Sequence, residues 1–379
     1  ASEERTGVAE RLNAEMREHS PSWADGPTSV VGGAPMVHSS AIVHEGARLG
    51  QGVVIGPYCV VGENVQLNDG VRLHSHVIVS GHTSIGPHSE IFPFAAVGAR
   101  PQDLKYQGEV SETRMGARCQ VHHHAHICGG TAGGGGQTIL GDDCLVMSHV
   151  HIGHDCAIGS RVILASKASL AGHVSIGDRA QISGHACVHQ RVHVGCGAFV
   201  AAAAVLLDDL IPYGLAAGAG RATVDNLNLR GLRRQRAPAT EQRAMLRAFR
   251  ALFDLPSRSR FDRAMLRHGG TVLEQGRVDT LAAFDNAGCV QGVVRERAAE
   301  LLKHTVGASR ASPGFDDVSD GRAPWSNVSA VGMGRHDALN AMGAAMPRLQ
   351  EMLRFVSDES RLRGLCMPSK RAAALRDAT

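Results

Sequence analysis

Aromatic side chains are scarce in this chain of 379 residues, and long apolar runs are missing. Phe, Trp and Tyr make up 4% of the sequence, with two Trp and three Tyr. A core built on large rings is therefore excluded, and a core of stacked aliphatic side chains is favoured. No apolar run reaches the length of a membrane-spanning helix, so no membrane span is predicted. No apolar core of a secretory signal is visible either.

The charge balance and the cysteines also exclude several classes of protein. The formal net charge is +3, and no basic pattern interleaved with aromatic residues suggests nucleic-acid binding. Nine cysteines occur without a CxxC pair. Four of them stand two residues before a regularly spaced aliphatic residue: Cys59, Cys119, Cys144 and Cys156. This repeated position indicates small structural residues, not a disulfide framework or a zinc site.

The sequence does contain a repeat of six residues, marked by an aliphatic side chain. Three runs share this period: Val43, Leu49, Ile55, Val61, Leu67, Leu73, Val79, Ile85, Ile91 and Val97, then Met115, Val121 and Ile127, then Leu140, Val146, Ile152, Ile158, Leu164, Leu170, Ile176, Ile182, Val188, Val194, Val200 and Leu206. A period of six fits neither an amphipathic helix nor an alternating strand. It predicts a solenoid of short strands that each send one branched side chain inward.

Two interruptions of the repeat predict loops that leave the solenoid. Residues 101–112 place Asp103 and Glu109 at positions where an aliphatic side chain is required, and neither belongs in an apolar stack. Residues 131–137, TAGGGGQ, add seven residues to one hexapeptide. Loops that project from a rigid repeat are common places for binding residues.

The predicted organisation has five parts. They are a leader or linker at 1–36, a hexapeptide β-helix at 37–215, a helical domain at 216–306, a linker at 307–334 and a C-terminal helical extension at 335–379. The extension contains apolar residues at alternating spacings of three and four, interrupted by Pro347. The polar leader, rich in Ser, Glu and Arg, leaves two locations open: the cytoplasm, or a mitochondrion or plastid if it is the remnant of a targeting segment.

Several motifs together resemble the UDP-N-acetylglucosamine O-acyltransferases of lipid A biosynthesis. They are the loop QDLKY at 102–106, HIGHDC at 151–156, LAGHV at 170–174, VHQ at 188–190 and NLRGLRR at 228–234. The resemblance covers residues 37–240 well and the later helices loosely. It implies a left-handed parallel β-helix of hexapeptide repeats followed by a small α-helical C-terminal domain. It also implies a homotrimer with active sites between neighbouring β-helices.

The resemblance implies transfer of a 3-hydroxyacyl group from acyl carrier protein to the 3-hydroxyl of UDP-N-acetylglucosamine, the first step of lipid A biosynthesis. No resident cofactor and no metal are expected, because 4′-phosphopantetheine arrives on the carrier protein. His154 is the implied general base, since an imidazole titrates near the working pH. Asp155 is the implied support for a protonated His154, although neighbouring residues on a strand face apart. The N–H of Gly172 is the implied oxyanion donor.

Further residues are assigned to substrates by the same resemblance. The implied contacts are Asp103, Lys105, His151, His173, His189, Gln190, Arg233 and Arg234, and Ala202 stands at the position that measures acyl-chain length. A basic stretch suits docking of an acidic carrier protein: Arg230, Arg233, Arg234, Arg236, Arg243, Arg247 and Arg250. The competing interpretations are a solvated charged loop for Asp103 and Lys105, polar edge positions for His151, His173 and His189, and a solvated helical face for the arginines.

The sequence also departs from the family. Cys128-Gly129 stand where the family usually has His-Arg, and His149 stands where it often has Asn. His122, His123, His124 and His126 are near enough in sequence to compensate. Three alternatives stay open: the UDP-3-O-acylglucosamine N-acyltransferase, a hexapeptide carbonic anhydrase with zinc on His149, His154 and a third histidine, and a non-catalytic structural trimer.

Overall fold

A computed structural model describes residues 33–253 and 347–357. The chain divides into two compact units, and each is described by itself. The first unit comprises the described residues up to Asp155, and the second comprises those from Cys156 onward. In both units, most strands are two to four residues long and pair in parallel across successive coils.

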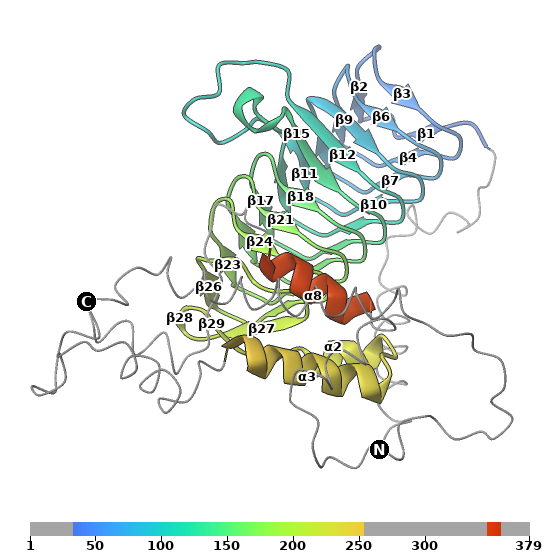
Figure 1. Ribbon diagram of the computed structural model, residues 1–379. Coiled ribbons are helices and arrows are strands. Elements are labelled where there is room, and N and C mark those ends of the chain that lie inside the picture. The colour runs from blue at the N-terminus through green and yellow to red at the C-terminus, as the bar shows by residue number, and fades with distance from the viewer. Residues whose placement is uncertain (1–32, 254–346, 358–379) are drawn as a thin grey trace, which may run out of the picture. The chain divides into compact units, whose positions relative to one another are not determined.

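Each coil of the first unit contributes one strand to each of three sheets (Figure 1). The first sheet contains β1 (Met36–Val37), β4 (Val54–Ile55), β7 (Arg72–Leu73), β10 (Glu90–Ile91), β13 (Gln120–Val121) and β16 (Leu145–Val146). The second contains β2 (Ile42–Val43), β5 (Val60–Val61), β8 (Ile78–Val79), β11 (Ala96–Ala99), β14 (His126–Cys128) and β17 (His151–Ile152). The third contains β3 (Arg48–Leu49), β6 (Gln66–Leu67), β9 (His82–Ile85), β12 (Glu112–Met115) and β15 (Gln137–Leu140).

The spacing of paired residues in this unit shows what a coil and its insertions contain. Met36 pairs with Val54, so an uninterrupted coil takes 54 − 36 = 18 residues, or three hexapeptides. His82 pairs with Glu112 at 112 − 82 = 30, and Glu112 pairs with Gln137 at 137 − 112 = 25. The two insertions therefore add twelve and seven residues. The sequence predicted both positions and the length of the second.

The second unit repeats this arrangement without insertions. One sheet contains β19 (Ile163–Leu164), β22 (Gln181–Ile182), β25 (Phe199–Val200), β27 (Gly214–Ala217) and β29 (Thr223–Leu227). Another contains β20 (Ser169–Leu170), β23 (Cys187–Val188), β26 (Ala204–Leu206) and β28 (Gly220–Arg221). The remaining strands are β18 (Ala157–Ile158), β21 (Ser175–Ile176) and β24 (His193–Val194). Ile163 pairs with Gln181 at 18 residues, and at the last coil Phe199 pairs with Leu215 at 16.

The predicted inward positions form the core of both units. Leu67, Ile127, Ile152, Leu170 and Ile182 are fully buried. Burial of one such side chain contributes about 1.5–3 kcal/mol relative to leaving it in water. The predicted cysteine positions are also buried, and the seven cysteines in the described residues are all free thiols. The first strand, β1, contains Val37, which precedes Val43 by six residues and stands at the predicted start of the β-helix.

Three helices are described after the strands, all in the second unit. They are α2 (Leu229–Arg234), α3 (Ala239–Phe253) and α8 (Pro347–Ser357). Helix α8 packs on α3 (Figure 1). Arg348 Nη1 donates to Oε2 of the buried Glu241 at 2.6 Å. Tyr213 Oη donates to Glu351 Oε2 at 3.2 Å and ties α8 to the last coil.

The structure differs from the predicted boundaries in two places. Residues 216–227 were assigned to the helical domain, but they belong to β27, β28 and β29, where β27 and β29 pair antiparallel and close the strand region. Pro347 was expected to interrupt a helix, but it is the first residue of α8, where a missing N–H costs nothing. The predicted leader to residue 32, the helical segment at 254–306, the linker at 307–334 and the rest of the extension lie outside the described residues.

Turn tips of the coils carry ordinary side chains in the left-handed region, which L-residues rarely adopt. In the first unit Tyr58, His76, Phe94, His124 and His149 all have φ between 57° and 64°. Their rings follow one another up the coils with centroid distances of 5.0, 4.8, 5.1 and 4.8 Å. We call this series the ring ladder. The equivalent tips of the second unit are Lys167, His185 and Ala203, so the ladder belongs to the first unit.

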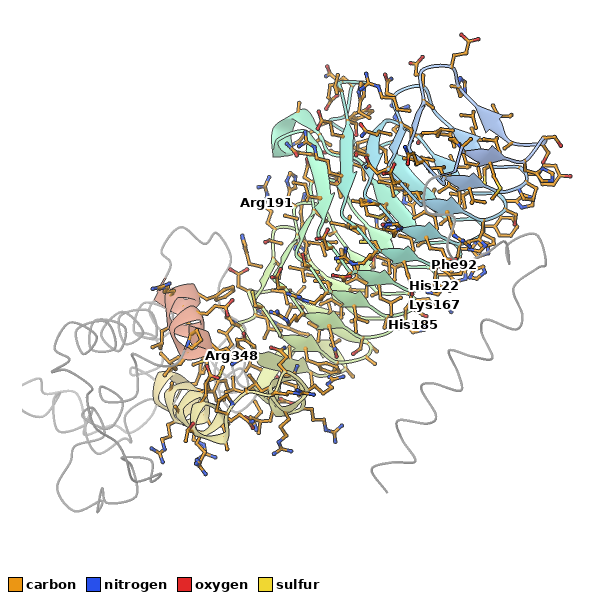
Figure 2. The ribbon with its side chains drawn as sticks, turned by 90° about the vertical axis from the view of Figure 1, so that its right-hand side faces the viewer. Phe92, His122, Lys167, His185, Arg191 and Arg348 are labelled. Atoms are coloured by element: carbon orange, nitrogen blue, oxygen red, sulfur yellow. The ribbon has the colours of Figure 1, made fainter. Side chains whose placement is uncertain are left out.

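A second set of stacked rings lies beside the ladder. Phe92 stacks on His74 at 4.7 Å and on His122 at 4.4 Å, and Figure 2 shows Phe92 and His122 next to each other. The Nε2 of His74 lies 2.8 Å from Glu90 Oε1. This hydrogen bond lowers the pKa of Glu90. The first unit therefore concentrates imidazoles on its surface.

Candidate functional site

His154 and Asp155 form the turn that follows β17, and both side chains are almost fully enclosed. His154 is 7% exposed and Asp155 is 8% exposed. His154 Nδ1 lies 2.7 Å from Asp155 Oδ2. The tendency of neighbouring strand residues to face apart does not apply here, because both residues belong to a turn and Asp155 has a φ of 59°. That backbone conformation turns the carboxylate back towards the preceding ring.

Asp155 also holds the Gly-rich excursion. Its Oδ1 accepts the Thr131 N–H at 2.8 Å, and its Oδ2 accepts the Thr131 hydroxyl at 2.6 Å. A Cβ on Gly134 would collide with the same carboxylate. The excursion contains the short 3-10 helix η1 (Ala132–Gly134) and closes against Asp155. Thr131 and Gly134 are therefore site residues that the sequence did not single out, although the TAGGGGQ segment located them.

The carboxylate fixes how His154 can act. When Nδ1–H donates to Asp155, Nε2 keeps its lone pair and can accept a proton from a substrate. A proton taken at Nε2 creates an imidazolium whose charge is balanced by the adjacent carboxylate. Three hydrogen bonds hold that carboxylate in place, so little reorganisation is required at the moment of transfer. The arrangement suits a general base for a hydroxyl or amine.

His151 has a partner that sequence reasoning did not assign to it. His126 Nδ1 lies 3.3 Å from His151 Nδ1, and their rings stack with centroids 5.4 Å apart. Cys128 Sγ lies 3.7 Å from the same His126 nitrogen. Burial lowers the pKa of both imidazoles, which favours their neutral forms near neutral pH. His126 therefore brings an imidazole into contact with the predicted contact residue His151, next to the position where the family's His is replaced by Cys128.

The first insertion, residues 100–111, carries Asp103 and Lys105 on a polar turn. Asp103 Oδ1 accepts the Lys105 N–H at 3.0 Å, and the Lys105 side chain is exposed. Arg100 lies over the Tyr106 ring, with its guanidinium carbon 5.4 Å from the ring centroid. Glu109 Oε1 accepts the Ala132 N–H at 3.3 Å, so the two insertions touch each other.

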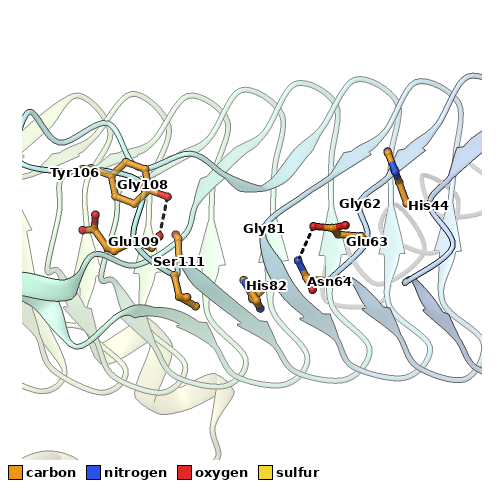
Figure 3. Close-up of a pocket in the computed structure, with 11 residues that line it drawn as sticks. His44, Gly62, Glu63, Asn64, Gly81, His82, Tyr106, Gly108, Glu109 and Ser111 are labelled. Carbon is orange, nitrogen blue, oxygen red and sulfur yellow. Dashed lines mark hydrogen bonds between the residues drawn. The ribbon is translucent and has the colours of Figure 1, made fainter.

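A polar pocket of about 570 Å³ lies beside this insertion (Figure 3). It is lined by His44, Gly62, Glu63, Asn64, Gly81, His82, Tyr106, Gly108, Glu109, Val110 and Ser111. Asp103, Lys105 and His154 are not among the lining residues. The first insertion therefore lines the pocket, but not through the predicted contact residues Asp103 and Lys105.

The remaining predicted residues belong to the second unit. Gly172 and His173 form the turn after β20, and Gly172 O accepts the Arg191 N–H at 3.1 Å. His189 and Gln190 are exposed after β23, with His189 Nδ1 3.4 Å from the Gln190 carbonyl oxygen. Ala202 is exposed between β25 and β26.

Arg233 and Arg234 end helix α2, and both are exposed. Arg234 Nη2 donates to Gln181 Oε1 at 3.2 Å, which directs this guanidinium towards the coils. Helix α2 itself is fixed at its start, where the buried Asn228 accepts the Gly231 N–H at 2.9 Å and donates to Gly197 O at 3.0 Å. Among the described residues, no helix is long and apolar enough to cross a membrane.

Comparison with known families finds two matching models. The model of the UDP N-acetylglucosamine O-acyltransferase, domain 2, matches residues 209–292. The model of the bacterial transferase hexapeptide matches residues 46–81 and 137–172. The second of these matches ends at Gly172 and includes His154.

Among curated proteins, the chain is similar to acyl-[acyl-carrier-protein]–UDP-N-acetylglucosamine O-acyltransferases. It is 46% identical to that of Paracoccus denitrificans over 153 residues, which are 40% of this chain and 58% of the relative. It is 39% identical to that of Myxococcus xanthus over 191 residues, which are 50% of this chain and 73% of the relative. The chain spans about three fifths of the length of the first curated relatives that it matches.

Solved structures give the same result. The UDP-N-acetylglucosamine acyltransferase of Francisella novicida aligns with a TM-score of 0.57 at 36% identity, covering 62% of this chain and 87% of that chain. The Arabidopsis enzyme of the same name aligns with a TM-score of 0.59 at 27% identity, covering 87% of this chain and 100% of that chain. The predicted fold class, a left-handed parallel β-helix with a small helical C-terminal part, is confirmed.

Proposed function

Because the chain belongs to the UDP-N-acetylglucosamine O-acyltransferase family, we propose that it catalyses the reaction for which that family is named. It transfers a 3-hydroxyacyl group from acyl carrier protein to the 3-hydroxyl of UDP-N-acetylglucosamine, at the entry to lipid A biosynthesis. The observation that carries this proposal is the enclosed pair of His154 Nδ1 and Asp155 Oδ2 at 2.7 Å. That pair places a carboxylate where it would stabilise the imidazolium that a general base forms.

In the proposed step, His154 Nε2 removes the proton of the sugar hydroxyl as its oxygen attacks the thioester carbonyl carbon. The C–S bond then breaks, and the proton on His154 passes to the departing thiolate of the phosphopantetheine arm. Asp155 stabilises the imidazolium in between. The Gly172 N–H is proposed to receive the oxyanion. No resident metal or cofactor takes part in this proposal, because the thiol arrives on the carrier protein.

The other predicted residues are proposed to bind the substrates. Asp103, Lys105 and His151 are assigned to the sugar nucleotide, with His126 supporting His151 through their 3.3 Å contact. His173, His189 and Gln190 are assigned to the sugar or the donor. Arg233 and Arg234 are assigned to phosphates and to the acidic carrier protein, supported by their exposure on α2. Ala202 is assigned to acyl-chain selection, and the assembly is proposed to be a homotrimer.

The test is acyl transfer to UDP-N-acetylglucosamine from a panel of 3-hydroxyacyl carrier proteins, with and without a chelator. We expect turnover by the wild type that is insensitive to the chelator. His154→Ala should lower kcat about 10²- to 10⁴-fold, the usual contribution of a general base. His185→Ala is the matched control, because His185 is an exposed turn-tip histidine outside the site. No turnover by the wild type with any donor would contradict the proposal.

One alternative makes a distinct prediction. A hexapeptide carbonic anhydrase would require zinc on His149, His154 and a third imidazole. In the structure, His149 stacks on His124 with ring centroids 4.8 Å apart, and His154 Nδ1 is hydrogen-bonded to Asp155. Zinc analysis of the purified chain, followed by a carbon dioxide hydration assay, separates this alternative from acyl transfer. We expect neither stoichiometric zinc nor hydration.

A further inference from the structure

Cys128 marks the departure from the family and has no part in the proposed function. It is the last residue of β14, stands where the family usually has His, and is fully buried. Side chains two positions apart on a strand project from the same side. Cys128 Sγ accordingly lies 3.7 Å from Nδ1 of His126. The departure from the family therefore places a thiol beside an imidazole.

The next coil adds a second imidazole to this thiol and ring. His126 on β14 pairs in register with His151 on β17, and paired residues of adjacent strands lie about 4.8 Å apart. The two Nδ1 atoms are 3.3 Å apart, which is longer than the usual hydrogen-bond range of about 2.7–3.2 Å. Both rings are half-buried. We call Cys128, His126 and His151 the thiol–imidazole cluster.

The spacing of atoms in the thiol–imidazole cluster resembles the spacing of ligands around a zinc ion. Zinc binds imidazole nitrogen at about 2.0–2.1 Å and thiolate sulfur at about 2.3 Å, in a tetrahedron. Those bond lengths separate two nitrogen ligands by about 3.3 Å and a nitrogen from a sulfur by about 3.6 Å. The cluster shows 3.3 Å and 3.7 Å. Cys128 Sγ contacts the His126 ring but not the His151 ring, so the thiol must turn about its Cα–Cβ bond to complete the set.

The neighbours on the preceding coil are small and uncharged. Ala96 pairs with His126, and Ala99 pairs with Cys128. A methyl side chain neither competes for the three ligand atoms nor repels a cation. The cluster is therefore bounded on this side by alanines, and its two half-buried rings leave a route for an ion from solvent.

We propose that Cys128, His126 and His151 bind one exchangeable Zn²⁺ ion. Thiolate and imidazole are ligands that zinc prefers. Binding forms one Zn–S and two Zn–N bonds, and the thiol proton passes to solvent. Three protein ligands leave the fourth position to water, unlike the closed four-ligand sites that hold structural zinc. We therefore expect the site to fill when zinc is added and to lose its ion during purification with a chelator.

Zinc at this place would compete with the sugar nucleotide. The proposed function assigns His151 to that substrate, and an imidazole nitrogen that binds zinc cannot also bind the nucleotide. Added zinc should therefore raise the KM for UDP-N-acetylglucosamine, and a chelator should reverse the effect. This consequence rests on the proposed function. Zinc binding itself does not, and it is measured without turnover.

The experiment is a titration of the metal-free full chain with Co²⁺, followed by Zn²⁺. Thiolate-bound Co²⁺ gives an intense near-ultraviolet charge-transfer band that imidazole-bound Co²⁺ lacks. We expect this band to saturate at one Co²⁺ per chain and to disappear when Zn²⁺ displaces the cobalt. Cys128→Ser should abolish the band and weaken Zn²⁺ binding at least about tenfold, because losing even a hydrogen-bond partner of a ligand costs about 10- to 100-fold.

Matched variants separate the cluster from the other thiols and imidazoles. Cys187 is exposed on β23, so Cys187→Ser should keep the band. His126→Ala should weaken Zn²⁺ binding as Cys128→Ser does. His124→Ala removes an exposed imidazole two residues away and should change binding less than about twofold.

Three results would overturn the proposal. They are absence of the band in the wild type, a band that survives Cys128→Ser, and equal losses of Zn²⁺ binding in His126→Ala and His124→Ala. The last result would show general attraction of zinc to surface histidines. None of these results depends on whether acyl transfer is found. Where turnover is found, Cys128→Ser should also lose its inhibition by zinc.

Discussion

The two units are built on the same hexapeptide period, and they differ in what they place on it. The first unit interrupts its coils twice and carries the ring ladder, whereas β18 to β26 of the second unit run without interruption and present Lys167, His185 and Ala203 at the equivalent tips. Both cores consist of the same branched aliphatic side chains. The six-residue period therefore determines the backbone fold, whereas the turn tips and insertions can vary and provide the functional side chains.

The largest effect should come from breaking the period itself. Deleting Ala165, in a turn of the second unit, moves each following side chain of that unit out of its inward position, so we expect loss of the cooperative fold of that unit. Deleting Gly135, an exposed insertion residue with no atom within 4 Å of its Cβ position, should leave the fold intact. Circular dichroism and thermal unfolding of both variants measure this difference. Equal stability of the two deletions would show that the coils do not depend on their period.

A smaller effect separates the core from the insertion. Leu170 is fully buried, and Leu170→Ala should lower the free energy of unfolding by about 2–5 kcal/mol. Leu104 is fully exposed on the first insertion, so Leu104→Ala should change the free energy of unfolding by less than about 0.5 kcal/mol. Denaturant unfolding of the two variants gives the comparison. A large loss on truncating Leu104 would mean that this side chain is covered in solution, for instance by another copy of the chain.

The smallest effect is a difference in pH dependence. Burial lowers the pKa of His122, His126 and His151, all in the first unit. Below about pH 6.5 these histidines bind protons in the unfolded chain but not in the folded unit, because their pKa is lowered by folding. The free energy of unfolding should therefore fall as the pH drops from this value towards the lowered pKa of the folded state. Glu90 does not contribute to this pH dependence, because a carboxyl group with a lowered pKa affects stability only below its ordinary pKa of about 4.5.

Hydrogen exchange resolved by peptide measures this dependence. Between pH 7.5 and 5.5, protection should fall more in the first unit than in the second, once intrinsic exchange rates are corrected. His122→Phe keeps a ring against Phe92 but cannot titrate, so it should reduce the difference. An unchanged difference in that variant would assign the pH dependence to other groups.

The period of six was sufficient to predict the fold because an aliphatic residue at every sixth position can be recognised directly in the sequence. Val43 to Leu206 can be counted along the sequence, and the insertions appear as Asp103 and as a run of glycines where aliphatic residues are due. The predicted positions of the strands were thus confirmed over both units. The hairpin of β27 and β29 was not predicted, because its pairing is antiparallel and its residues no longer follow the period.

The site was only partly accessible to the same reasoning. His154 and Asp155 were singled out by resemblance, but their contact depends on a left-handed turn conformation that no spacing rule indicates. Thr131 reaches Asp155 across 24 residues of sequence, and His126 meets His151 across 25. Contacts of this kind come from stacking one coil on another through an insertion. They become visible only when the register of the insertion is known.

The regular spacing of the turn tips has a consequence for protein design. Their separation along the coils is set by backbone hydrogen bonds, at about 4.8 Å per step, and not by the side chains that they carry. Each series of tips is therefore a one-dimensional lattice: in the first unit, one series carries rings and another carries an Arg–Asp pair. Substituting the tip residues, while keeping the inward aliphatic residues, should therefore give a protein that carries chosen side chains in a line, about 4.8 Å apart.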